Sequence, residues 1–362
     1  MGKTLKLAAL VAALAAFALP AAAASAAHSA AAGDAVYAIT NAPSGNGVAT
    51  YARAADGTLS YVGTYATGGL GTGAGLGSQG ALTLADNGKH LFAVNAASNS
   101  ISEFAVKNDG LRLEATFSSN GVLPISVTAN KNLLYVLNAG SSSITGFKID
   151  GNGRVESIDG STQTLLGTAP AQVAFSPSGS SLVVTEKGSR TLDTFAVSGG
   201  VAQPGVSSAS AGATPFGFAF DGLGRAFVSE AAGSTSSYAI DASGAHVISG
   251  AVATHQGAPC WLVVTTDGRF AYTANAGGAT ISGFSIDANG ALALLDPTGA
   301  TAVLGAGAHP LDEAVSSDGQ FLYVLVDGRH AVAGYRIGAD GSLSPLGEVG
   351  TLPAGAVGLA SS

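Results

Sequence analysis

One short motif recurs seven times along this chain, and it constrains the fold more than any other feature of the sequence. Each copy is an apolar run, and six of the seven end in Asn or Glu. The steps between the last residues of the copies are 54, 43, 48, 44, 45 and 51 residues. A period in the forties built from short strands indicates a propeller blade. Because a single blade cannot bury both of its faces, the units must stack around an axis. The copies lie at residues 37–41, 92–95, 135–138, 183–186, 227–230, 272–275 and 323–326.

One repeat illustrates the blade that we expect. Apolar runs at 260–264, 270–275, 280–286 and 291–295 are separated by segments that include Asp-Gly and Asn-Gly. These dipeptides between alternating apolar runs are strong hairpin signals. The first run of each blade, strand a, tends to begin after a proline, where the missing amide donor is tolerated. These prolines are Pro124, Pro170, Pro215, Pro259, Pro310 and Pro353.

The two ends of the chain predict how the ring closes. Candidate strands b, c and d begin near Val36, Val48 and Leu59 with no strand a before them, whereas Pro353–Leu359 reads as a lone strand a. We therefore predict an all-β, seven-bladed propeller with four antiparallel strands per blade. Its C-terminal strand completes the N-terminal blade and hides the sheet edges. Residues 34–362 make up this single domain.

The N-terminal segment predicts export. Lys3 and Lys6 precede an apolar run from Leu7 to Leu19, and small residues follow. This pattern is typical of a secretory signal peptide, which we assign to residues 1–27. The apolar run is shorter than the roughly 20 residues that a spanning helix needs, although the Ala tract would lengthen it. A periplasmic or secreted protein without membrane attachment after cleavage is expected, with an uncleaved anchor as the alternative.

Composition narrows the classes of partner and cofactor. The chain has 23 acidic and 15 basic residues, for a net charge of −8, and no Lys/Arg cluster, so we expect neither nucleic acid nor anionic membranes as partners. Cys260 is the only cysteine, which excludes an internal disulfide. The six histidines lack zinc-binding spacing. We predict a monomer with no cofactor and no metal, while a channel ion held by side chains from different blades stays open.

The ends of the b strands are the first candidates for a site. Because strands a and b are antiparallel, each b-strand end should lie beside the start of strand a, on one face of the ring. Glu186 and Glu230 replace Asn in consecutive blades, and two neighbouring carboxylates raise one pKa, as a general acid or base requires. We take these two as the catalytic candidates. The alternative is that each is solvated or paired, for instance Glu186 with Lys187 or Arg190.

Further residues near the same face are candidates for substrate binding. An Arg beside a polar channel mouth suits a carboxylate through bidentate hydrogen bonds. Each candidate also has a structural alternative: an Asn caps a turn, a charged loop residue is solvated, and the tryptophan fills the inner wall. The candidates are Arg190, Lys187, Gln172, Asn138, Asn275, Trp261, His309 and Asp312.

Two familiar enzyme signals are missing. The chain has no Gly-x-Ser-x-Gly, so the nucleophile elbow of an α/β-hydrolase is absent. Gly75–Gly80 matches the dinucleotide-binding pattern by letter but precedes a predicted strand rather than a helix. We interpret Gly69–Gly80 as a long, flexible loop over the channel end of the second blade.

Two segments resemble a known family. Residues 170–179 followed by 183–186, and residues 135–140 followed by 144–147, are similar to the lactonase family of seven-bladed propellers, which includes 6-phosphogluconolactonases and carboxymuconate cyclases. The resemblance extends from about residue 34 to 360. It implies a channel-mouth site for opening or closing a lactone ring.

The resemblance also carries over two residues by position, an acidic one at Glu186 and a basic one at Arg190. It departs at Ala171, where many members have a His after the strand-a proline. Export is a further mismatch, because sugar phosphates are cytosolic. The leading hypothesis is an exported lactonase-like hydrolase or cyclase for a small lactone or carboxylate, in which Glu186 and Glu230 activate water and Arg190 holds the substrate. The alternative is a non-catalytic exported propeller that binds a glycan, a peptide or a partner protein.

Overall fold

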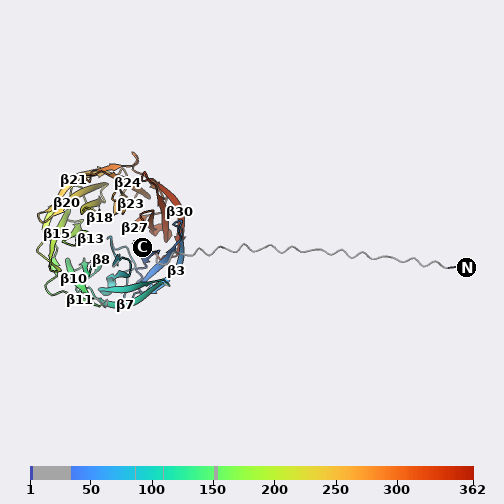
Figure 1. The fold of residues 1–362 in the computed structure, drawn as a ribbon, viewed down its shortest axis with the longest axis horizontal. Coiled ribbons are helices and arrows are strands. Elements are labelled where there is room, and N and C mark those ends of the chain that lie inside the picture. Colours follow the sequence, from blue (N-terminus) through green and yellow to red (C-terminus); the bar gives the residue numbers. More distant parts are fainter. Residues whose placement is uncertain (3–33, 86, 109, 151–153) are drawn as a thin grey trace.

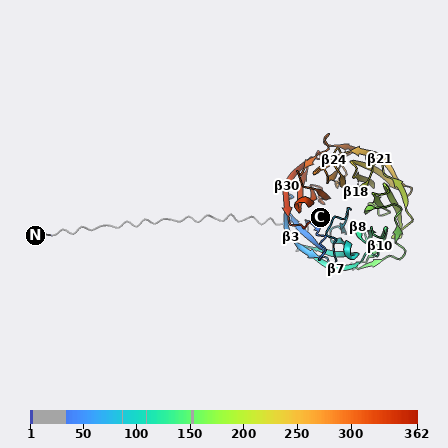
Figure 2. The same ribbon diagram turned by 180° about the vertical axis from the view of Figure 1, so that it is seen from behind.

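A computed structural model describes residues 1–2, 34–85, 87–108, 110–150 and 154–362. In this part of the chain, seven antiparallel sheets form a ring, seen end-on in Figure 1 and from behind in Figure 2. The prediction of a seven-bladed propeller is therefore confirmed. Most of the predicted signal peptide lies outside the described residues. Within them, no helix is both long enough and apolar enough to cross a membrane.

Each blade is a meander whose strands follow one another from the channel outward. Figure 1 shows β8, β13, β18 and β27 near the centre and β3, β7, β21 and β30 at the periphery. Blade 1 consists of β31 (Val357–Ser361), β1 (Ala35–Ile39), β2 (Gly47–Arg53) and β3 (Leu59–Ala66). Blade 2 consists of β4 (Leu82–Ala85), β5 (His90–Asn95), β6 (Ser100–Lys107) and β7 (Gly110–Ser118). Blade 3 consists of β8 (Pro124–Asn130), β9 (Leu133–Asn138), β10 (Ser143–Ile149), β11 (Val155–Ser157) and β12 (Gln163–Thr164).

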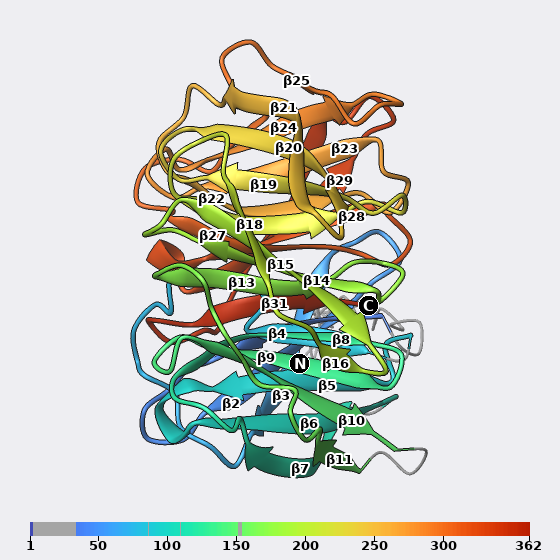
Figure 3. The same ribbon diagram turned by 90° about the vertical axis from the view of Figure 1, so that its left-hand side faces the viewer.

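The remaining blades repeat the pattern, and the strands of all blades run across the thickness of the ring (Figure 3). Blade 4 consists of β13 (Pro170–Phe175), β14 (Ser181–Glu186), β15 (Thr191–Ser198), β16 (Val201–Ala202) and β17 (Val206–Ala209). Blade 5 consists of β18 (Pro215–Phe220), β19 (Arg225–Glu230), β20 (Ser234–Asp241) and β21 (Gly244–Ala253). Blade 6 consists of β22 (Pro259–Val264), β23 (Phe270–Asn275), β24 (Thr280–Ile286), β25 (Leu292–Leu294) and β26 (Ala302–Val303). Blade 7 consists of β27 (Pro310–Val315), β28 (Phe321–Val326), β29 (Ala331–Ile337) and β30 (Leu343–Gly350). Two single 3₁₀ turns complete the set, η1 (Ala96–Ser98) and η2 (Asp327–Arg329).

The ring closes in blade 1 as predicted. β31 pairs antiparallel with β1, with Val357 opposite Ile39 and Ala360 opposite Tyr37. The Ser362 amide donates to the Ala35 carbonyl at 3.0 Å, which extends the ladder by one bond. The C-terminus consequently lies near the middle of the ring in both end-on views (Figures 1 and 2).

The tyrosines of the repeated motif explain part of its sequence. In three blades the strand-b tyrosine donates its hydroxyl to a backbone carbonyl in the c–d turn of the next blade. The pairs are Tyr135 with Gly200 (2.9 Å), Tyr272 with Gly341 (2.9 Å) and Tyr323 with Gly57 (2.8 Å). A buried tyrosine needs such a partner for its hydroxyl. The motif therefore links each of these blades to the next one.

Side chains of the b strands face neighbouring blades. Val183 of β14 packs with Phe218 and Val228 of blade 5, and Phe227 of β19 packs with Leu262 and Ala271 of blade 6. Because both faces of the middle strands are covered in this way, those strands are buried along almost their whole length. Their side chains therefore fill the spaces between blades and leave the wall of the channel to the a strands.

Candidate active site

The predicted residues were expected at the end of the channel where the a strands begin. In five blades the proline that opens strand a is paired directly with the last residue of strand b, as the antiparallel arrangement predicts. These pairs are Pro124–Asn138, Pro170–Glu186, Pro215–Glu230, Pro259–Asn275 and Pro310–Val326. The backbone of the motif thus reaches this face, but the direction of each side chain decides which residues meet.

The asparagines at these positions hold loops and neighbouring strands together. Asn138 is fully buried, and its Nδ2 donates to the Ser119 carbonyl at 3.2 Å. Asn275 is also buried and donates to the hydroxyls of Thr280 and Ser282 at 3.0 and 2.9 Å. These contacts match the capping alternative for Asn more closely than a role in substrate binding.

Glu230 is buried among hydrogen-bond donors of its own blade. Its carboxylate accepts bonds from the Gly212 amide at 2.8 Å and from the hydroxyls of Ser234 and Ser236 at 2.5 and 2.6 Å. A Cβ on Gly212 would lie 2.0 Å from Glu230 Oε2, so only glycine allows this close approach. A carboxylate with this many donors anchors the loop that precedes β18.

Glu186 is paired with a carboxyl group that the sequence reasoning did not consider. Burial, and then the neighbouring Asp193 on β15, raise the pKa of Glu186 to about 8. Asp193 Oδ2 accepts from the Leu166 amide at 2.7 Å, whereas Glu186 Oε1 and Asp193 Oδ1 have no donor among the described residues. One proton shared by the two neighbouring carboxyl groups accounts for these two oxygens without another donor.

The expectation that Glu186 and Glu230 lie together is thus not matched by their contacts. Each is fully buried, and its hydrogen bonds to other described residues lie within its own blade and the loop before that blade. The reason is the direction of the b-strand side chains described above, which point between blades. Register explains the partner of Glu186: it is opposite Thr191, so Asp193 is its diagonal cross-strand neighbour.

The other predicted residues of blade 4 have separate positions. Arg190 is exposed, with a left-handed φ of 59°. Lys187 extends across the mouth, donates from Nζ to the Gly77 carbonyl, and lies 4.8 Å from the centroid of the Phe216 ring. Burial lowers the pKa of Lys187. Gln172 accepts from the Phe218 amide at 2.7 Å and donates to its carbonyl at 2.9 Å, which ties β13 to β18.

Residues 75–80 enter the channel. The Gln79 side chain accepts from the Leu262 amide at 2.8 Å and donates to its carbonyl at 2.7 Å. Ser78 Oγ donates to the Ile125 carbonyl at 2.9 Å, and the Ser78 carbonyl accepts from Trp261 Nε1 at 2.9 Å. The segment is therefore bonded to blades 3 and 6 on different sides of the ring. It forms part of the floor and wall of the mouth rather than only covering blade 2.

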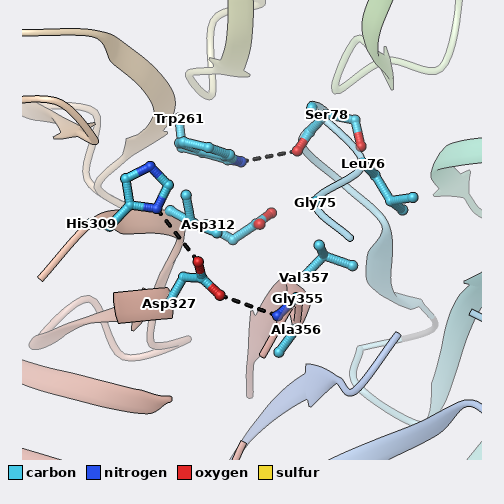
Figure 4. A pocket seen from close by; sticks show the side chains of 12 residues that line it. Gly75, Leu76, Ser78, Trp261, His309, Asp312, Asp327, Gly355, Ala356 and Val357 are labelled. Atoms are coloured by element: carbon cyan, nitrogen blue, oxygen red, sulfur yellow. Dashed lines mark hydrogen bonds and ion pairs between the residues drawn. The ribbon is translucent and has the colours of Figure 1, made fainter. Parts of the chain in front are cut away.

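A cavity of about 280 Å³ opens beside this segment (Figure 4). Three of the predicted residues line it, and they come from blades 6 and 7. The other lining residues are Leu311 and Asp327 of blade 7, the 75–78 segment, and residues 355–357, which lead into β31. The cavity is lined by Gly75, Leu76, Gly77, Ser78, Trp261, His309, Leu311, Asp312, Asp327, Gly355, Ala356 and Val357.

The polar groups of this cavity form one pair and one isolated acid. His309 Nδ1 lies 3.6 Å from Asp327 Oδ2, and Asp327 Oδ1 accepts from the Gly355 amide at 3.3 Å. Asp312 is 2% exposed, and its carboxyl accepts from the Gly358 amide at 3.0 Å. Burial raises the pKa of Asp312 to about 7, an effect that the Gly358 amide partly offsets. Figure 4 shows the Asp312 carboxyl directed into the space between Trp261 and Asp327.

This arrangement has the elements of acid–base chemistry. A half-exposed imidazole oriented by a carboxylate is a candidate base, and a carboxyl group with a pKa near neutrality is a candidate acid. His309 adopts a left-handed φ of 49°, a conformation that it shares with the residues before the strand-a prolines of other blades and that therefore belongs to the repeat rather than to this cavity; these residues are Leu123, Ala169, Thr214 and Ala258. Among the described residues, no three His, Cys, Asp or Glu side chains come close enough together to hold a metal ion.

Sequence reasoning missed Asp327 and the β31 wall of the cavity. Asp327 directly follows Val326, the one motif end that is neither Asn nor Glu. A polar residue displaced by one position at that irregular repeat was the available signal. The role of Gly355–Val357 follows from the ring closure, because strand a of blade 1 must also border the channel.

Comparison with known proteins identifies a family to which the sequence is similar. The family model described as "Lactonase, 7-bladed beta-propeller" matches residues 114–214 and 218–355. No curated protein matches the sequence.

Solved structures with the same fold include three of similar extent. A protein from Bacteroides fragilis NCTC 9343, provisionally assigned as a 6-phosphogluconolactonase, has a TM-score of 0.71 and 20% identity, over 91% of this chain and 98% of that one. A Lactobacillus plantarum protein has a TM-score of 0.74 and 19% identity, over 91% and 99%. The periplasmic gluconolactonase of Pseudomonas aeruginosa has a TM-score of 0.67 and 18% identity, over 88% and 97%. At these identities the likeness shows the fold.

Proposed function

The chain belongs to the lactonase family of seven-bladed β-propellers, and from this premise we propose that it hydrolyses a small lactone in the cavity lined by Trp261, His309 and Asp327. The observation that carries the proposal is the meeting of the His309–Asp327 pair with the buried Asp312 carboxyl in one cavity. Its volume of about 280 Å³ is near the lower end of the roughly 300–1,000 Å³ typical of ligand pockets, which suits a single small ring.

The residues supply a base and an acid on the same cavity. Asp327 faces Nδ1 of His309, which leaves Nε2 to take a proton from water as the water oxygen adds to the lactone carbonyl carbon. Asp312, protonated in part near pH 7, donates a proton to the ring oxygen as the carbon–oxygen bond of the ring breaks. The product is a hydroxy acid, whose carboxyl group then loses its proton.

This mechanism differs from the one expected from sequence. We place the acid–base groups at His309 and Asp312 because both line the cavity. Glu186 and Glu230 are fully buried within their own blades, and Arg190 is exposed outside the lining. The role first assigned to Glu186, Glu230 and Arg190 stays a prediction that the same experiment tests.

Export belongs to the proposal. The N-terminal pattern of Lys3, Lys6 and the following apolar run supports secretion, so the substrate would be a lactone outside the cytoplasm. Cell fractionation with detection of the mature N-terminus tests this part, and recovery of the intact chain in the cytoplasm would contradict it.

A second candidate function has one observation in its favour. The channel mouth is occupied by residues 75–80, and the ring of Phe216 packs edge-on against Trp261 with centroids 5.0 Å apart. A site closed in this way also suits a non-catalytic propeller that binds a sugar, a peptide or a partner protein. Saturable binding of an intact lactone without turnover would favour this function.

The deciding experiment is a hydrolysis screen of sugar and muconate lactones with the mature protein. His309→Gln and Asp312→Asn should each lower kcat/KM roughly 10²- to 10⁴-fold, because each removes one proton-transfer group. Thermal unfolding monitors the fold of each variant. Glu186→Gln separates the two mechanisms: it keeps turnover if His309 is the base and loses it if Glu186 is. Wild-type protein that opens no lactone in the screen would refute the proposed function.

A further inference from the structure

The ionisable groups on the described cavity wall are acidic side chains and one histidine. Among the described lining residues, Asp312 and Asp327 are acidic, His309 is the one histidine, and no Lys or Arg is present. The whole chain also has more acidic than basic residues. Near pH 7 an approaching anion therefore meets the negative charge of Asp327 and of the ionised fraction of Asp312 inside the cavity, and the net negative charge of the chain adds to this repulsion at long range.

The cations close to this face already have partners. Lys187 Nζ donates to the Gly77 carbonyl and lies over the Phe216 ring. Arg329 lies in η2, two residues after Asp327, and donates to Glu348 and to the Leu304 carbonyl. Arg190 is exposed and does not line the cavity. A phosphate or carboxylate in the cavity would thus lack the guanidinium or ammonium group that normally binds it.

The rest of the wall is apolar. Its apolar lining consists of glycines of the 75–77 segment together with Leu76, Trp261, Leu311, Ala356 and Val357. Apolar surface with a few polar groups suits an uncharged ring, because burial there is favourable and no charge loses its hydration.

We propose that the cavity selects by charge and accepts an uncharged lactone in preference to one that carries a phosphate or a carboxylate. This inference rests on the proposed hydrolysis and specifies its substrate class. It removes carboxylate-bearing substrates from the sequence-based expectation. Hydrolysis also creates a carboxylate that Asp312 and Asp327 repel, so the hydroxy acid product should leave the cavity readily.

A matched pair of substrates tests the inference. Glucono-1,5-lactone and its 6-phosphate share the ring and differ by the phosphate. Wild-type kcat/KM should be about tenfold or more higher for the uncharged lactone, since like charges brought together in a site are strongly disfavoured. Raising the ionic strength should increase the rate with the phosphate and leave the rate with the uncharged lactone unchanged, because salt screens the repulsion.

Gly75 offers a place to reverse the charge. It lines the cavity, its φ lies outside the left-handed region, and a Cβ built there meets no atom within 4 Å. Gly75→Lys should raise the ratio of the phosphate rate to the uncharged rate roughly two- to sixfold over Gly75→Gln, as expected for a charge about 8 Å from the phosphate. The glutamine variant controls for the bulk of the new side chain.

The outcomes separate this inference from the proposed function. Turnover of both lactones at equal rates, or faster turnover of the phosphate, overturns the charge selection and leaves the hydrolysis intact. A preference for the uncharged lactone that neither salt nor Gly75→Lys alters also overturns it, because the selection is then steric. Turnover of neither lactone, nor of any other in the panel, refutes the proposed function itself.

Discussion

Glu186 and Glu230 end the b strands of consecutive blades, yet their carboxyl groups meet different surroundings. Glu230 faces hydrogen-bond donors, whereas Glu186 faces the Asp193 carboxyl. In Glu230→Gln the new side-chain NH₂ group would face the backbone amide and the hydroxyls that now donate to the carboxylate. We expect the free energy of unfolding to fall by about 2–3 kcal/mol at pH 8. Glu186→Gln should instead stabilise the fold at pH 8, because its amide can donate to Asp193.

The pH dependence of stability checks this contrast. The pKa of Glu186 is raised to about 8 in the folded protein from an ordinary 4.5. Between these values the folded chain keeps a proton that the unfolded chain loses, so the free energy of unfolding falls as the pH rises from about 4.5 to 8. Urea unfolding across this range should show a shallower decline for Glu186→Gln than for wild type. An equal decline in both would contradict the shared proton.

A second buried acid lies next to the proposed active site. Glu313 of β27 is buried, and burial raises its pKa well above the ordinary value, which the backbone of Ala274 offsets only in part. Glu313→Met removes this buried acid at similar volume. We expect a gain of about 1–3 kcal/mol in unfolding free energy at pH 8 and a smaller gain near pH 4.5, where the carboxyl group is protonated in the folded state and about half protonated in the unfolded state.

The matched control for Glu313 is Glu156→Gln, whose wild-type side chain is 60% exposed. Urea unfolding at the two pH values should show no comparable change for this variant. A loss of stability at pH 8 in Glu313→Met would mean that the acid serves as a needed polar partner in the folded protein.

At the scale of elements, residues 75–80 connect the site to the ring. Gln79→Ala removes the side chain that bonds both the amide and the carbonyl of Leu262. We expect this change to lower the free energy of unfolding by about 1–3 kcal/mol. Because the same segment forms a wall of the cavity, KM for the lactone should rise more than kcat falls. Gln203→Ala is the control, since the wild-type side chain donates to the carbonyl of Val201, two residues away, and bonds no other blade among the described residues. Steady-state kinetics with equal KM in both variants would show that the segment does not shape the cavity.

The elements also show what the sequence predicts well and what it does not. The motif placed the ends of the b strands correctly in six blades, down to the pairing of Pro170 with Glu186, whereas β1 of blade 1 ends at Ile39, two residues before Asn41. It did not indicate that those side chains point between blades, because a period of two residues does not say which neighbour covers which face. Trp261, His309 and Asp312 line the cavity because they belong to a strands or precede one. Asp327 escaped prediction because it follows the motif rather than ending it.

At the scale of the whole molecule, the shared blade is the feature that holds the ring closed. A circular permutant that joins Ser362 to residue 34 through Asn-Gly and opens between β30 and β31 keeps all four strands of blade 1. Ser362 and Ala35 are already hydrogen-bonded, so the short turn fits. No blade then joins the two ends of the chain. We expect a loss of about 3–5 kcal/mol of stability from the lost closure.

A second permutant gives the comparison. New termini in the exposed turn after Asp287, between β24 and β25, divide blade 6 between the two ends and so keep the ring locked. Its urea midpoint should stay close to that of wild type. If both permutants lose the same stability, the cut itself is responsible and the shared blade has no special role.

The start of β31 borders the cavity, while the rest of the same strand completes blade 1. A proteolytic nick or an early stop before residue 355 would remove both contributions in one event. Each molecule that has lost these residues would lack both a wall of the cavity and the innermost strand of blade 1. The proposed lactone hydrolysis per molecule would therefore depend directly on an intact C-terminus.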